Sequence, residues 1–170
     1  MPTYRIVPDL SQVWLEAQSS LHPIHGEGKG LSGSIEAEVV DGRLNLSGTP
    51  QIRLELPIEA LKSGKATEDK EMMRRVDARR YPSIRGEVKD VQESSPGRYR
   101  MQGDLTFHGV TRTVEGEVEL SQPGGDGTIV LEGEQTFDIR DFGVQPPKIL
   151  MFKVHPDVKV RVRVVAQEEE

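Results

Sequence analysis

The four histidines are the first candidates for metal binding or acid–base chemistry, and their spacing favours neither. His22 and His25 lie three residues apart in "HPIH", so on a strand they would point to opposite faces unless Pro23 bends the chain. His108 stands in a turn beside a glycine and His155 in another connection, and neither has an obvious catalytic partner in the sequence. We interpret the pair as rim residues and expect no metal site.

Carboxylates and nucleophiles give an equally weak signal for catalysis. Asp69, Asp77, Asp138 and Asp141 could include an acid–base pair, but most surface carboxylates are solvated or ion-paired. The chain has no cysteine, and it contains no nucleophile elbow, P-loop or dinucleotide fingerprint. We therefore expect a protein that is not an enzyme and that uses no cofactor.

Composition limits the other partners. The chain has 170 residues, 35% of them hydrophobic, which suits a single domain, predicted over 1–166 with a disordered acidic tail over 167–170. Its net charge of −6 comes without any basic run, which disfavours nucleic acid as a partner. The start lacks the pattern of a secretory signal, and no run of 18 apolar residues occurs. We expect a cytoplasmic protein without stable membrane insertion, or a periplasmic or secreted one if a leader has been removed.

Strict alternation of apolar and polar residues is the main structural signal. It predicts β-strands, each with one wet face and one packed face, joined by turn signals such as "DG", "SSPG" and "PGGDG". An antiparallel meander of this size favours an all-β up-and-down barrel, which has no exposed edges, with a two-sheet sandwich as the main competitor. The eight segments are 13–21, 35–39, 52–58, 84–89, 99–107, 114–120, 129–139 and 158–164.

One segment, "KATEDKEMMRRVDARRYP", departs from this alternation. It predicts a short helix over Glu68–Ala78, with Thr67 as its N-cap and Pro82 limiting it on the far side. Two methionines and a valine at helical spacing give the helix an apolar face. The helix either plugs one end of the barrel or lies on its surface with that stripe against the core.

Small residues on the packed faces predict a hollow interior. An eight-stranded barrel is just wide enough to fill with side chains or to hold one small ligand, and glycines favour the second. Each glycine alone could instead mark a bulge or a tight bend. Gln135 and Ser19 are the few polar residues at inward positions, so the ligand should be a hydrocarbon. The inward glycines are Gly86, Gly103, Gly116 and Gly133.

Several stretches carry a resemblance to a known family. These are "YRIVPDLSQVWLEA" at the start, "RRYPSI", "YRMQGDLTFHGVTRTVEGEVEL" and "FDIRDFGV". Together they resemble the YceI family of lipocalin-like, polyisoprenoid-binding proteins over nearly the whole chain, most specifically through Gly103–Arg112. Tyr4, Asp9 and Ser11 look like its opening motif, and Arg140–Gly143 like its late "R-D-F-G".

The resemblance implies a fold and a ligand. The fold would be an elongated eight-stranded antiparallel lipocalin-like barrel around an apolar tunnel for a long isoprenoid or fatty-acyl chain. Many members look secreted or periplasmic, and homodimers occur in the family, so a homodimer is plausible. The chain departs from the family pattern at Ser19 and Gly28, where the family usually has His and Phe, which predicts an altered entrance.

These observations predict a non-enzymatic carrier or sequestering protein that buries an aliphatic tail. A polar head would stay at the mouth near Lys62, Arg112 or Arg140. Leucine in place of Gly103 or Gly116 should block loading and leave the barrel folded. The predicted tail-binding residues are Val13, Leu15, Ala17, Leu54, Leu56, Met101, Gly103, Leu105, Phe107, Gly116, Val118, Ile129, Leu131, Phe137 and Phe142.

Two other classes of function remain open. An enzyme acting on a lipid-like substrate would need convergent polar groups inside the barrel, and the inward rows supply few. A protein-interaction module would have a filled core and an outer apolar patch. Trp14, Val130 and Val165 are the few apolar residues at outward positions, and they could equally form a dimer interface.

Overall fold

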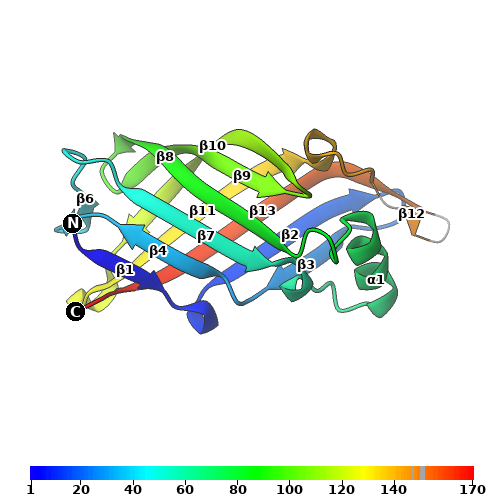
Figure 1. Ribbon diagram of the computed structural model, residues 1–170, viewed down its shortest axis with the longest axis horizontal. Helices are drawn as coiled ribbons and strands as arrows, with labels where there is room; N and C mark the ends of the chain where they lie inside the picture. The colour runs from blue at the N-terminus through cyan, green and yellow to red at the C-terminus, as the bar shows by residue number, and fades with distance from the viewer. Residues whose placement is uncertain (147, 150–151) are drawn as a thin grey trace.

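The computed structural model describes residues 1–146, 148–149 and 152–170, and most of them form a closed antiparallel β-barrel (Figure 1). The two termini lie together at one end of the elongated molecule, and the helix lies at the other (Figure 1). The barrel wall consists, in chain order, of β1 (Thr3–Ile6), β2 (Gln12–Ser19), β3 (Ile24–Gly28), β4 (Ser32–Glu36), β7 (Gln51–Pro57), β8 (Ser83–Ser95), β9 (Arg98–Phe107), β10 (Val110–Ser121), β11 (Thr128–Asp138) and β13 (Phe152–Glu168).

Short elements connect and cover these strands. Two-residue strands form β5 (Val39–Val40), β6 (Arg43–Leu44) and β12 (Lys148–Ile149). Single 3₁₀ turns form η1 (Pro8–Leu10), η2 (Ile58–Ala60), η3 (Pro123–Gly125) and η4 (Ile139–Phe142), and the α-helix α1 spans Ala66–Arg75.

The barrel closes because the first strands pair with the last one. Both β1 and β2 pair with the long strand β13, through Tyr4↔Glu168 and Val13↔Val162. They therefore form one kinked position in the wall, and β3 and β4, which pair with β2 and β1, form the next. With β7, β8, β9, β10, β11 and β13 this gives eight positions, all antiparallel, and the predicted eight-stranded up-and-down barrel is confirmed.

The kink between β1 and β2 is held by one buried hydroxyl. Ser11 has no solvent exposure, and its Oγ donates to the Val7 carbonyl at 2.9 Å. The same oxygen accepts a hydrogen bond from the Val165 N–H at 3.0 Å. Ser11 thus supplies the acceptor for the Val165 N–H where the β-ladder is interrupted, and links it to the Val7 carbonyl.

Helix α1 begins earlier than its sequence pattern indicates. The predicted cap, Thr67, lies inside the helix, and Lys65 is at the N-cap position without a side-chain bond. The reason is a turn before the helix: the Ser63 Oγ accepts the Lys65 N–H at 3.1 Å, and an Asp69 carboxylate oxygen accepts the Ser63 N–H at 2.7 Å. The α-helix also ends at Arg75, three residues before the predicted Ala78.

Two further segments differ from expectation. Strand β3 covers His25 and was not among the predicted strands. The predicted disordered tail, 167–170, is ordered at its start, because β13 runs to Glu168 and Gln167 pairs with both Arg5 and Thr128. The Glu169 N–H then bonds to the Thr3 carbonyl at 2.8 Å.

The densest packing lies at the end that holds the termini. Tyr99 is fully buried there, and its hydroxyl accepts the Leu44 N–H at 2.8 Å, which ties the β5–β6 hairpin to the barrel. An ion pair between Arg43 and Glu93 adds a second tie. Side chains that fill this end include Tyr4, Ile35, Ile52, Tyr99 and Ile129.

Candidate functional site

The barrel interior changes from filled to hollow along its length. On β9, Tyr99 and Met101 are buried, whereas the next apolar inward residues, Leu105 and Phe107, are only half-buried. The same change occurs on β13, from buried Val164 to half-buried Val160. Half-buried aliphatic side chains that point into a barrel must face empty space, so the candidate site is the half of the barrel towards α1.

A cavity of about 230 Å³ lies between the filled end and the part of the barrel next to α1. Its inward-facing lining is aliphatic and aromatic apart from glycines and Gln135, so it offers an apolar surface with almost no groups that need hydrogen bonds. Of the predicted tail-binding residues, it brings together Leu54, Met101, Gly103, Leu105, Gly116, Val118, Leu131 and Phe137.

A second cavity of about 110 Å³ lies under helix α1. Leu15, Ala17 and Phe107 from the predicted set line it, and Met72 and Val76 reach it from the helix. Phe107 and Leu105 are adjacent inward residues on β9, so the two cavities succeed each other along the barrel axis. Helix α1 therefore covers the hollow end of the barrel, in agreement with the first of its two predicted placements. Around the apolar wall lie the polar residues His25, Lys62, Ser63, Glu68, Asp69 and Arg75.

Four predicted residues reach neither cavity. Val13, Leu56 and Ile129 are packed into the buried core. Phe142 is also buried, on η4, where its ring centroid lies 5.7 Å from that of Phe107. Ser19, expected as a polar group inside the barrel, instead accepts the His22 N–H at 3.0 Å and closes the β2–β3 turn.

The inward glycines serve two different purposes. A Cβ built on Gly86 meets no atom within 4 Å, and one on Gly116 meets only the Gln135 side chain, at 3.6 Å. At Gly103 a Cβ would overlap the backbone of Glu87 and Val88, and at Gly133 it would stand 3.1 Å from the Glu117 carbonyl oxygen. Gly86 and Gly116 leave space, whereas the other two let neighbouring strands approach closely.

The three predicted head-group residues differ in their availability. Arg140 is ion-paired to Asp138 at 2.7 Å, and the hydrogen bonds from Arg140 lower the pKa of the Asp138 carboxyl. Arg112 donates from Nε to the Asp141 carbonyl at 2.9 Å and keeps an exposed side chain. Lys62 is exposed and forms no ion pair within the described part of the chain, and it adjoins the end cavity.

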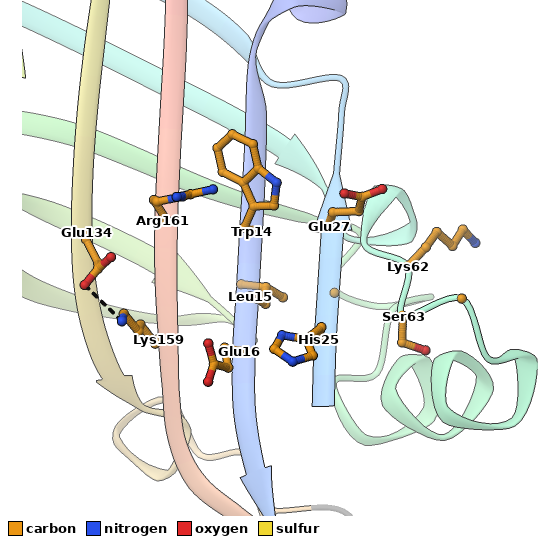
Figure 2. A pocket seen from close by; sticks show the side chains of 12 residues that line it. Trp14, Leu15, Glu16, His25, Glu27, Lys62, Ser63, Glu134, Lys159 and Arg161 are labelled. Carbon is orange, nitrogen blue, oxygen red and sulfur yellow. Dashed lines mark ion pairs between the residues drawn. The ribbon is translucent and has the colours of Figure 1, made fainter. Parts of the chain in front are cut away.

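A polar groove of about 520 Å³ on the outer face had no signal in the sequence. Figure 2 shows its side chains rising from β11, β13, β2 and β3, with Lys62 and Ser63 on the far wall. The Arg161 guanidinium lies 4.2 Å from the centroid of the Trp14 ring, and Lys159 pairs with Glu134 at 3.3 Å (Figure 2). The groove shares Leu15, His25, Gly26, Lys62 and Ser63 with the end cavity, so the two lie on opposite sides of one stretch of wall.

Three of the residues considered for catalysis are engaged in local structure. The Asp69 carboxylate accepts the Ser63 N–H, and the Asp138 carboxylate accepts the Arg140 N–H at 2.9 Å. His108 bonds through Nδ1 to the Phe142 carbonyl at 3.0 Å and stacks edge-on against Tyr81. Over the described ranges, no group of three or more His, Asp or Glu side chains is arranged to hold a metal ion.

The outer apolar patch that an interaction module would use does not form from Trp14, Val130 and Val165. Val130 and Val165 are opposite each other on β11 and β13, and both are buried. The chain before η1 runs along this pair, where the Val7 N–H donates to the Val165 carbonyl at 2.8 Å. Trp14 is half-buried beneath Arg161.

Comparisons with known proteins agree on the fold. A family model described as the YceI-like domain matches residues 4–166. BcnA of Burkholderia cenocepacia superposes with a TM-score of 0.79 at 18% identity, covering 95% of this chain and 99% of that one. A polyisoprenoid binding domain of Saccharophagus degradans gives 0.76 at 12%, covering 98% of both chains. The Campylobacter jejuni YCEI protein gives 0.70 at 20%, covering 85% of both.

No curated protein matches the chain in sequence. Among the described residues, no helix has the length and apolar character needed to cross a membrane.

Proposed function

Since the chain belongs to the YceI-like family, we propose that it binds one long aliphatic chain, of the isoprenoid or fatty-acyl class, inside its barrel and carries or sequesters it unchanged. The observation that carries this proposal is the apolar cavity of about 230 Å³ in the hollow half of the barrel. The structural neighbour described as polyisoprenoid binding supports the same class of ligand.

Burial of the hydrocarbon supplies the affinity. Each buried CH₂ group contributes about 0.8 kcal/mol, so ten of them give roughly 8 kcal/mol before the cost of ordering the chain. A strong polar anchor is therefore unnecessary, which suits a cavity whose main inward polar side chain is Gln135.

The two cavities together are small for a long chain. Sites for drug-sized ligands usually measure about 300–1,000 Å³, and the cavities measure about 230 and 110 Å³. A long ligand would have to extend beyond them, either by displacing side chains between the two cavities or by leaving part of its length outside the barrel.

The rival functions have less support. An interaction module with a filled core does not fit the hollow half of the barrel. The outer apolar patch that such a module would use is also missing, because Val130 and Val165 are buried. An enzyme would need several polar groups converging in the cavity. A homodimer and a cytoplasmic location stay predictions, which the mass of the native protein and cell fractionation would test.

The direct test is native mass spectrometry of the purified protein, followed by extraction and identification of any bound molecule. The delipidated protein is then titrated with geranylgeraniol and with the fluorescent fatty acid cis-parinaric acid. We expect one molecule bound per chain and recovered chemically unchanged. A protein that purifies empty and takes up neither compound would refute the proposal.

A further inference from the structure

The pairing between β10 and β11 stops partway along the barrel. Their ladder extends only from Ser121↔Val130 to Val118↔Gly133, although β10 begins at Val110 and β11 continues to Asp138. Each strand stays fully paired on its other side, β10 with β9 and β11 with β13. The two strands therefore separate from each other while each remains paired in the wall.

The separation is closed again at its far end. Beyond it, the Arg112 Nε donates to the Asp141 carbonyl at 2.9 Å, and the His108 Nδ1 bonds to the Phe142 carbonyl at 3.0 Å. These bonds join β10 and the turn before it to η4, which follows β11. We call the unpaired stretch between the two ends, 112–117 on β10 and 134–138 on β11, the side window.

The side window opens into the larger cavity. Val114, Gly116, Gln135 and Phe137, from the facing edges of the two strands, all line that cavity. Gln135 pairs in register with Val160 on β13 and so holds an inward position, yet its side chain is exposed. An inward residue that is exposed at the middle of a barrel wall shows that the wall is open there.

Gln135 lies across this opening. A Cβ built on Gly116 would be 3.6 Å from the Gln135 Oε1, so the amide reaches the opposite strand where no side chain stands. The amide can swing aside by rotating about side-chain bonds without breaking any pair of the barrel ladder.

The carboxylates on the outer rim of the side window are ion-paired. Glu115 pairs with Arg100 at 3.2 Å, and Glu117 pairs with Arg98 at 3.6 Å. On the other edge, Glu134 pairs with Lys159 at 3.3 Å. A hydrocarbon that passes this rim therefore does not have to desolvate an unpaired carboxylate.

We propose that the aliphatic ligand enters and leaves the barrel laterally, through the side window, with Gln135 as the residue that gates it. This rests on the proposed function, because it assigns a route to the same ligand. A lateral route also accommodates a chain longer than the cavity, since the excess length can remain outside between β10 and β11.

The test measures release of a preloaded ligand. The chain has no natural cysteine, so Gln135→Cys gives a single labelling site. The variant is first loaded with cis-parinaric acid and then coupled to a bulky maleimide, after which excess unlabelled fatty acid is added and fluorescence decay is followed. We expect release to slow by about tenfold or more, since an obstructed passage changes the rate and not the contacts of the bound chain.

Thr136→Cys is the matched control. Thr136 is the next residue on β11, is exposed and faces outward, so the same label there lies on the outer surface beside the side window and does not enter the cavity. Release from labelled Thr136→Cys should equal that of the unlabelled protein. If Gln135→Cys folds poorly, Gly116→Cys places the label on the opposite edge of the side window, where a Cβ meets only the Gln135 side chain.

Each outcome decides the question. Release that is unchanged or faster after labelling at the side window overturns the lateral route, and so does equal slowing in the Thr136→Cys control. If the unlabelled wild-type protein cannot be loaded at all, the proposed function itself fails. Failure of the route and failure of the function are therefore separate results.

Discussion

Gly103 and Val88 touch across the β8–β9 pair: a Cβ on Gly103 would stand 2.9 Å from the Val88 Cα. The contact lies at a bulge, where the register between the two strands shifts between Val88 and Asp90. Gly86, two residues before Val88 on β8, meets nothing within 4 Å of a Cβ. Two inward glycines on neighbouring strands therefore have opposite roles, one in close backbone contact and one in keeping the cavity open.

Larger residues at Gly86 should fill the cavity and leave the fold intact. The backbone at Gly86 has a conformation that any L residue can adopt, and the space in its Cβ direction is empty. Gly86→Ala should therefore stabilise the barrel by about 0.5 kcal/mol, because alanine lowers the conformational entropy of the unfolded chain. Gly86→Leu should keep the melting temperature and weaken cis-parinaric acid binding by about tenfold or more, since its side chain takes up volume that the hydrocarbon needs. The series Ala, Val, Leu is compared by thermal melts and titration. Undiminished affinity in Gly86→Leu would place the ligand elsewhere.

Substitution of Gly103 should instead damage the barrel itself. The expectation that Gly103→Leu leaves the barrel folded is wrong, because even a methyl group at this position overlaps the Glu87 and Val88 backbone. Gly103→Ala should therefore cost about 1–3 kcal/mol, in the range of other overpacking changes. Urea unfolding measures this loss, with Gly86→Ala as the matched glycine control. A Gly103→Ala protein as stable as the wild type would show that β8 can move away at little cost.

The kink at Ser11 should be a sensitive point for stability. Ser11→Ala removes the acceptor of the Val165 N–H and one of the donors to the Val7 carbonyl. Ser11 has no solvent exposure, so water cannot replace the lost acceptor. We expect a loss of about 1–3 kcal/mol in the free energy of unfolding. Ser32→Ala is the control, because that hydroxyl is exposed and makes one long bond of 3.5 Å, and it should change stability by less than about 0.5 kcal/mol. Equal effects of the two substitutions would contradict this role.

The strand pattern predicts the barrel well because alternation is a local property. A wall with a wet side and a packed side imposes a period of two on each strand, so the eight positions can be recognised one at a time. The alternation does not predict β3, because "IHGEG" has only one aliphatic residue. This segment is a strand because it pairs with β2, from Val13↔Gly28 to Ala17↔Ile24. Pairing of that kind depends on the neighbouring strand.

The candidate site is less predictable for the same reason. Gly86 and Gly103 look alike in sequence. Gly86 faces empty space, whereas Gly103 is in close contact with the backbone of β8, where the register shifts at a bulge. The side window has no local signature, because alternation continues through Val114 and Gln135 as though the strands were paired. Burial of Val130 and Val165 likewise depends on a chain segment distant in the sequence.

Lys62 and Arg140 should differ in their effect on an anionic head group. Lys62 adjoins the end cavity with no ion pair in the described ranges, whereas the charge of Arg140 is held by Asp138. Lys62→Gln should weaken binding of a fatty acid by about two- to fivefold, the scale of an exposed ion pair, and leave binding of the matching fatty alcohol unchanged. Arg140→Gln should alter neither affinity. If Arg140→Gln weakens fatty-acid binding selectively and Lys62→Gln does not, the head group lies near η4.

The Asp138–Arg140 pair should make the far end of the side window sensitive to acid. Hydrogen bonds from the Arg140 side chain, and then from its backbone N–H, lower the pKa of Asp138 from its ordinary 3.8. A carboxyl whose pKa is lower in the folded state stabilises the fold above the unfolded pKa, and this contribution is lost as pH falls through the folded pKa.

The difference in free energy of unfolding between wild type and Asp138→Asn should therefore be constant near neutral pH and shrink below pH 3.8. Urea midpoints for both proteins on either side of that pH measure the change, and the same comparison in an Arg140→Gln background should show a smaller difference near neutral pH. A difference that persists undiminished in acid would contradict a stabilising role for the Asp138 charge.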